Sequence, residues 1–144
     1  MTRTRASSSG SGATTTSALI LATRDSRVAA GLGGALAHDE VAISEPVLLE
    51  YLNGARNAAE YARFDETLRA VRLLSTTPAD WQRALVVHRK LADSGPGHQR
   101  SVRLVDLIVA AVAERHAYAI AHADRDYDRI AGFTGQAVRW VARP

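Results

Sequence analysis

The chain has 144 residues, 47% of them apolar, and a formal net charge of +3 from 18 basic and 15 acidic side chains. It contains no cysteine, which excludes a disulfide framework, a thiolate nucleophile and a cysteine-ligated zinc site. The charge bias is too small to identify a nucleic-acid-binding protein by itself. We expect no membrane segment, because no apolar run approaches the length of a spanning helix, and a cytoplasmic location, because cysteine is absent.

Along the chain, apolar periodicity predicts strands that alternate with helices. Residues 1–13 are rich in Ser, Gly and Thr and predict a polar tail, followed by one domain at 14–144. Residues 15–22 predict a short strand turning into a helix, and residues 27–36 a helix weakened by glycine. Residues 41–44 predict a buried strand, and a helix follows from residue 44 or 45 to about Gly54.

The second half continues the alternation. An amphipathic helix is predicted at 58–72, and another runs from a Thr77 cap and Pro78 to about Asp93. Alternating strands and helices predict an α/β fold with a parallel sheet and helices on both faces. The remaining elements predicted here are strands at 73–75, 118–122 and 138–141, a buried helix within 101–114, and a loop entering a short helix at 124–131.

Asp106 lies in the most apolar segment of the chain. Valine, leucine, isoleucine and alanine occupy nearly every position around it, which predicts a buried helix. A buried carboxylate is costly unless it is paired or coordinates something. Asp106 is therefore a candidate functional residue. The alternative is an aspartate at a helix start whose oxygens accept hydrogen bonds from backbone amides.

Glu50 and Asp124 are two further acidic residues in apolar surroundings. Asp124 follows the predicted strand at 118–122, and Glu50 lies about one helical turn beyond the strand at 41–44. Sites form at the carboxyl ends of parallel strands, so we expect both residues to approach Asp106. The alternative for Glu50 is the polar face of an amphipathic helix.

Carboxylates that gather at one place repel one another, and a bound Mg²⁺ or Mn²⁺ relieves that repulsion. Such an ion also activates water and stabilises charge that develops on a phosphodiester. In an arginine-rich α/β domain without cysteine, this pattern favours a metal-dependent nuclease.

Four stretches in order make the chain resemble the PIN-domain family and, within it, the VapC-type toxins of bacterial toxin–antitoxin pairs. The resemblance implies a three-layer α/β/α domain with a short central parallel sheet, which usually dimerises. It also implies a magnesium- or manganese-dependent endoribonuclease that a small antitoxin inhibits. The stretches are Thr16–Ile20, Glu45–Gly54, His98–Ala111 and His122–Ala131.

The resemblance also assigns roles to residues. Glu50, Asp106 and Asp124 match the family's acidic site, and Asp126 matches a second acidic position of the last motif. Ser17 matches a hydroxyl near the metal. From charge and position alone, Arg100 or Arg103 is a candidate contact for RNA phosphate.

The first motif departs from the family pattern at Thr15. The family has an aspartate at this position, at the end of an apolar strand, whereas Thr15 follows Ser-Gly-Ser-Gly-Ala-Thr. Threonine offers an oxygen without a charge, so the departure implies weaker metal binding or loss of catalysis. Two alternatives therefore stay open beside the ribonuclease: a catalytically defective PIN-fold binding module, and a metal-dependent DNA nuclease.

Overall fold

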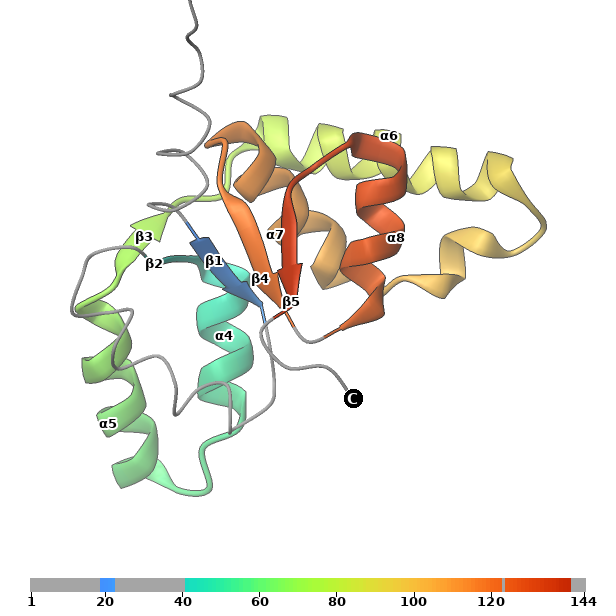
Figure 1. Ribbon diagram of the computed structural model, residues 1–144. Helices are drawn as coiled ribbons and strands as arrows, with labels where there is room; N and C mark the ends of the chain where they lie inside the picture. Colours follow the sequence, from blue (N-terminus) through green and yellow to red (C-terminus); the bar gives the residue numbers. More distant parts are fainter. Residues whose placement is uncertain (1–18, 23–40, 123, 141–144) are drawn as a thin grey trace, which may run out of the picture.

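A five-stranded parallel sheet organises the protein, whose computed structural model describes residues 19–22, 41–122 and 124–140, with only the backbone described for 19–22. The strand order is β3-β2-β1-β4-β5, so β1 lies at the centre between β2 and β4 (Figure 1). Every pairing is parallel, which requires a crossover between neighbouring strands. The strands are β1 Leu19–Ala22, β2 Val41–Ser44, β3 Arg72–Leu74, β4 Ala119–His122 and β5 Val138–Trp140.

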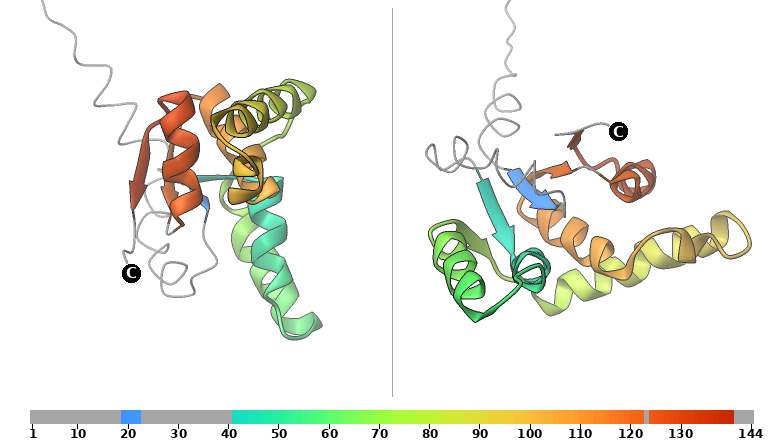
Figure 2. Two further views of the ribbon diagram at one scale, coloured as in Figure 1. Left: turned by 90° about the vertical axis from the view of Figure 1, so that its right-hand side faces the viewer. Right: turned by 90° about the horizontal axis from the view of Figure 1, so that it is seen from below.

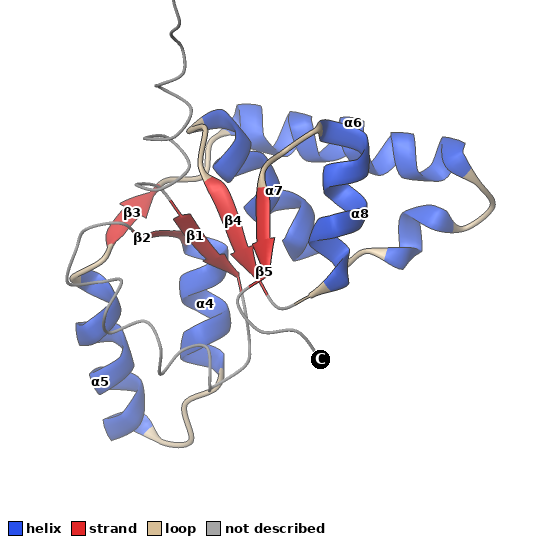
Figure 3. Ribbon diagram, viewed as in Figure 1, coloured by secondary structure: helices blue, strands red, loops and turns tan. Residues whose placement is uncertain are grey.

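Helices supply the crossovers from β2 to β3, from β3 to β4 and from β4 to β5 (Figure 3). The sequence marks the start of one of these helices and the end of another. Thr77 and Asp80 form a reciprocal capping box at the start of one, and Gly135 ends another in the left-handed conformation that glycine adopts without strain. The helices are α4 Glu45–Asn53, α5 Ala58–Arg69, α6 Pro78–Ser94, α7 Leu104–Arg115 and α8 Arg125–Thr134, with a short 3₁₀ turn, η1, at His98–Ser101.

The core lies between the sheet and helix α7. Residues 106–113 of α7 are all buried, because this helix packs against β1 and β4 below it and against α6 and α8 beside it. Figure 2 shows α4, α7 and α8 on the same face of the sheet. Of the predicted three-layer arrangement, the described residues provide the sheet and one helical layer. Within this part of the chain, no helix is long and apolar enough to cross a membrane.

Most predicted elements are confirmed, including the strand at 41–44, the helix that follows it and the helix capped at Thr77. Two boundaries were wrong. The helix predicted at 58–72 ends at Arg69, because residues 72–74 pair with β2 as a strand. No loop opens the segment at 124–131, since Asp124 caps α8 directly. Residues 19–22 are strand throughout, and the tail and the helix predicted at 27–36 lie outside the described residues.

Candidate active site

Three aspartates converge at the carboxyl end of the sheet. Asp106 lies in the first turn of α7, while Asp124 and Asp126 lie where β4 passes into α8. Each contributes a carboxylate oxygen, and these oxygens lie within 4.8 Å of one another. The proximity arises because the chain enters α7 and α8 from the same edge of the sheet, as expected for a parallel α/β fold.

Asp106 is the buried member of this aspartate cluster, with only 2% of its surface exposed. Its Oδ1 accepts a hydrogen bond of 3.0 Å from the hydroxyl of Tyr127. Its Oδ2 is buried and has no hydrogen-bond partner. The interpretation of Asp106 as a residue satisfied by backbone amides is therefore wrong. A buried oxygen without a partner is costly, and a cation would offset that cost.

The protonation of Asp106 reflects this environment. Burial raises the pKa of Asp106 to about 7, and the neighbouring carboxyl groups of Asp126 and Asp124 add to the rise. Arg103 and Tyr127 favour the charged form but do not offset the effect of burial. Burial also raises the pKa of Tyr127 well above its ordinary value, so its hydroxyl stays protonated and remains a donor. Without a cation, Asp106 is therefore about half protonated at neutral pH, whereas an ordinary aspartate is fully ionised there.

The carboxylates of Asp124 and Asp126 are fixed by hydrogen bonds from backbone N–H groups. The Asp124 carboxylate accepts a hydrogen bond of 3.0 Å from the backbone N–H of Asp126, which caps α8. The Asp126 carboxylate accepts one of 2.9 Å from the backbone N–H of Arg103, the residue before α7. The first bond fixes Asp124 within the cap of α8, and the second joins the start of α8 to the start of α7, so backbone groups as well as side chains position the cluster.

Glu50 reaches the site through Arg103. The guanidinium of Arg103 donates a hydrogen bond to Oε1 of Glu50. The other terminal nitrogen, Nη1, lies 3.7 Å from Oδ1 of Asp106 and 3.7 Å from Oδ2 of Asp124. Glu50 thus faces the site from α4 but lies outside the group of three aspartates. In this structure Arg103 contacts carboxylates, whereas the sequence suggested it as a phosphate contact.

His122 contacts the backbone of Asp124 and helps to position this residue. It is the last residue of β4 and is fully buried, and its Nδ1 accepts a hydrogen bond of 3.2 Å from the backbone N–H of Asp124. Its Nε2 lies 3.5 Å from Asp128, whose other oxygen accepts a hydrogen bond of 2.9 Å from the indole N–H of Trp140. Burial lowers the pKa of His122, so the neutral ring that this arrangement requires is favoured.

The remaining candidates from the sequence lie elsewhere. Thr15 and Ser17 are outside the described residues. Arg100 is exposed in η1, with its guanidinium folded against Gly97. Sequence reasoning missed Tyr127, although an aromatic residue three positions after Asp124 was a usable signal for the buried face of α8.

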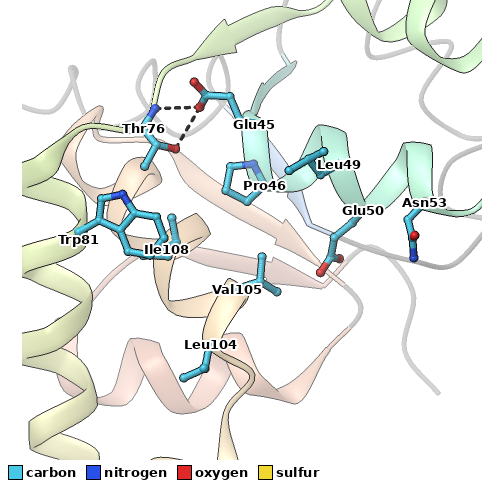
Figure 4. Close-up of a pocket in the computed structure, with 10 residues that line it drawn as sticks. All are labelled: Glu45, Pro46, Leu49, Glu50, Asn53, Thr76, Trp81, Leu104, Val105 and Ile108. Carbon is cyan, nitrogen blue, oxygen red and sulfur yellow. Dashed lines mark hydrogen bonds between the residues drawn. The ribbon is translucent and has the colours of Figure 1, made fainter.

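An apolar groove of about 940 Å³ runs beside the acidic site (Figure 4). Glu45, Glu50 and Asn53 line the groove from α4, and Oε1 of Glu45 accepts hydrogen bonds from Thr76. Three large side chains of the groove are strongly exposed: Leu49 at 64%, Trp81 at 56% and Leu104 at 69%. Exposed apolar side chains grouped in this way are typical of interaction surfaces and of ligand-binding grooves. The other lining residues are Pro46, Val105 and Ile108.

The fold and site define an α/β domain with a carboxylate cluster suited to hold a hard divalent cation. Comparison with known proteins gives the same class. Residues 16–133 match the PIN domain family. Ribonuclease VapC18 of Mycobacterium tuberculosis is 36% identical over 107 residues, which are 74% of this chain and 78% of the relative. Ribonuclease VapC21 of the same organism is 38% identical over 97 residues, 67% and 69% of the two chains.

Solved structures of VapBC proteins have a similar fold. The VapBC-5 toxin–antitoxin structure from M. tuberculosis aligns with a TM-score of 0.55 at 27% identity, over 86% of this chain and 98% of the other. The DNA-bound VapBC structure from Salmonella typhimurium aligns with a TM-score of 0.60 at 15% identity, over 85% and 97%, and shows the shared fold. The chain belongs to the PIN-domain family, and its relatives are VapC ribonucleases of toxin–antitoxin systems.

Proposed function

We propose that the protein is a VapC-type endoribonuclease that uses Mg²⁺ or Mn²⁺ to hydrolyse RNA phosphodiester bonds. The observation that carries this proposal is the convergence of Asp106, Asp124 and Asp126 around the buried, unpartnered Oδ2 of Asp106. Carboxylate oxygens at this spacing are the donor set that hard divalent cations prefer. The naming of relatives such as VapC18 and VapC21 as ribonucleases supports RNA as the substrate class.

Each residue has a distinct task in this mechanism. Asp106, Asp124 and Asp126 would hold the ion, which when bound supplies an activated water and offsets charge on the phosphodiester. Tyr127 keeps the Asp106 carboxylate in one orientation by donating to its Oδ1. Glu50 faces the same space from α4, where its carboxylate accepts the guanidinium N–H of Arg103. Arg100 is one of the exposed basic residues available to contact RNA phosphate.

Cleavage of a mixed RNA pool in Mg²⁺ or Mn²⁺ tests the proposal. The wild-type protein should cut the RNA, and Asp106→Asn should abolish the activity. Asp65→Asn is the matched control, because Asp65 is also ion-paired, with Arg69 on α5, but does not belong to the aspartate cluster. Cleavage that survives Asp106→Asn would disprove the assigned site. Single-stranded DNA of the same sequence serves as the competing substrate, and preferential cutting of DNA would assign the chain to DNA nucleases instead.

We also propose that an inhibitory antitoxin covers the apolar groove and that the protein forms a homodimer. The related solved structures of VapBC-5 and of the Klebsiella pneumoniae complex are toxin–antitoxin complexes, which supports a small protein partner. Leu49, Trp81 and Leu104 present an apolar surface beside Glu50, so an occupant of the groove would also limit access to the site. Co-expressed cognate antitoxin should silence cleavage by the wild type but not by a Trp81→Ala, Leu104→Ser double variant. Analytical ultracentrifugation tests the homodimer.

A second candidate function is a catalytically defective binding module, and Thr15 favours it. The first-motif position carries no charge in this chain. Restoring the aspartate with Thr15→Asp separates the two functions. RNA cleavage by the wild type supports the ribonuclease, whereas cleavage only by the restored protein would make the natural chain a binding module.

A further inference from the structure

The acidic site contains a cation of its own. The guanidinium of Arg103 lies among Glu50, Asp106 and Asp124, in contact with carboxylates from three different parts of the chain. Arginine does not lose its charge at any pH at which the protein is folded. The side chain is 35% exposed, so it has room to move toward solvent. Arg103 is thus a permanent positive charge beside the oxygens that would bind a metal.

The contacts of Arg103 are of two kinds. Its bond to Glu50 is a direct charge-assisted hydrogen bond, the stronger type of ion pair. Its Nη1 lies 3.7 Å from both Asp106 and Asp124, which is too long for a hydrogen bond. The guanidinium is therefore hydrogen-bonded to Glu50, whereas its interaction with the two aspartates is electrostatic only. This difference lets Arg103 give up the aspartates while it remains paired with Glu50.

We propose that Arg103 is an internal counter-cation that competes with the metal ion for Asp106 and Asp124 and thereby sets the metal affinity of the site. The inference rests on the proposed metal-dependent function. A divalent ion and a guanidinium a few ångströms apart repel each other, so either cation weakens the hold of the carboxylates on the other. The coupling is reciprocal: a bound metal drives Arg103 away from the aspartates, and Arg103 raises the metal concentration needed for binding.

If Arg103 competes with the metal, replacing its side chain should raise the metal affinity; if it supports metal binding, the same change should lower it. The backbone N–H of Arg103 holds Asp126, and this bond does not involve the Arg103 side chain. Replacement of the side chain therefore removes the charge but leaves the aspartate cluster anchored. If the side chain instead positioned Glu50 to help bind metal, its removal would weaken binding.

Calorimetric titration with Mn²⁺ measures the sign. Arg103→Gln should bind Mn²⁺ about tenfold more tightly than the wild type, a difference equivalent to about 1.4 kcal/mol. Arg103→Lys keeps the charge and should bind close to the wild-type affinity. Arg83→Gln is the matched control, because Arg83 also pairs with a glutamate: its Nε lies 2.7 Å from Oε1 of Glu114. Glu114 lies eight residues after Asp106 on α7, roughly 12 Å farther along the helix. The affinity of this control should be unchanged.

Three results would overturn the inference: weaker Mn²⁺ binding by Arg103→Gln, unchanged binding, or an equal gain in the Arg83→Gln control. If Mn²⁺ binds the wild type and Arg103→Gln equally, only the counter-cation fails, and the proposed ribonuclease stands. If Mn²⁺ binds none of the proteins, the metal-dependent function fails as well. These outcomes separate the two claims.

A measurement on the wild-type protein covers the case in which Arg103→Gln does not fold. The guanidinium signal of Arg103 in NMR spectra, assigned with Arg103→Lys, should shift as Mg²⁺ is added, because the ion displaces the side chain from Asp106 and Asp124. The Arg83 signal should stay in place. A Mg²⁺ titration that saturates the site without moving the Arg103 signal would overturn the inference.

Discussion

Neutralising Asp106 should make the metal-free protein more stable, although it destroys the proposed site. Asp106→Asn removes the charge but keeps an oxygen that accepts the hydrogen bond from Tyr127. The wild-type carboxyl is 2% exposed, and its Oδ2 has no hydrogen-bond partner. The variant therefore resembles the protonated form of the wild type, which is the form that burial favours.

The magnitude follows from the pKa of Asp106, which rises from 3.8 in the unfolded chain to about 7 in the folded protein. Because its folded-state pKa is above the unfolded value, the contribution of Asp106 to the free energy of unfolding is fully present below about pH 4 and is lost as the pH rises through 7. Roughly three pKa units correspond to about 4 kcal/mol over this range, of which about 3 kcal/mol falls between pH 5 and pH 8. The stability of Asp106→Asn should lack this loss.

Urea unfolding in EDTA at pH 5, 6, 7 and 8 provides the assay, with wild type and Asp106→Asn measured in parallel. Titrating groups that do not interact with Asp106 contribute equally to the two proteins, so the difference between their unfolding free energies reports Asp106 and the groups coupled to it. That difference should grow with pH in favour of the variant. Curves that stay parallel from pH 5 to 8 would refute the assignment of Asp106 as a buried carboxyl with a raised pKa. With Mn²⁺ present the trend should reverse, because metal binding requires the charged form.

Three further predictions test the surroundings of the site. Asp124→Asn should weaken Mn²⁺ binding at least tenfold by calorimetry, whereas Asp65→Asn should not change it. Asp80→Ala should lower the free energy of unfolding in urea by about 2–3 kcal/mol, because it removes the capping box of α6 and leaves Arg115 without its buried partner; RNA cleavage below the unfolding temperature should persist. Thr15→Asp should increase Mn²⁺ affinity and RNA cleavage, and unchanged affinity would mean that position 15 adds no charge to the site.

The elements of this fold were predictable where the signal is local. The apolar surroundings of Asp106 indicated a buried helix, and α7 is buried along residues 106–113. The Thr77-Pro78 pair marked the start of α6 at the correct residue. The start of α8 was misplaced because an aspartate can lie in a loop or cap a helix, and only the hydrogen bond from the N–H of Asp126 to Asp124 distinguishes the two.

The contacts within the site were not predictable from the sequence, because they join distant segments. Tyr127 donates to a carboxylate 21 residues earlier, and Arg103 pairs with one 53 residues earlier. Charge and position suggested Arg103 as a contact for a negative group, but the sequence could not say that the group belongs to the protein itself. The complete burial of His122 follows from its place at the end of the interior strand β4, which lies between β1 and β5.

Charge balance connects the internal cation with the departure at the first motif. Among the described residues, Glu50, Asp106, Asp124 and Asp126 carry a formal charge of −3 together with Arg103 when all four acids are ionised, and one divalent ion reduces this to −1. An aspartate at position 15, as the family pattern has it, would add to the attraction for metal, and threonine does not. The fewer carboxylates a site offers, the larger the share of their field that a fixed guanidinium neutralises. Arg103 should therefore neutralise a larger share of the carboxylate charge in this chain than it would beside a first-motif aspartate, and Thr15→Asp should raise the metal affinity of both the wild type and Arg103→Gln.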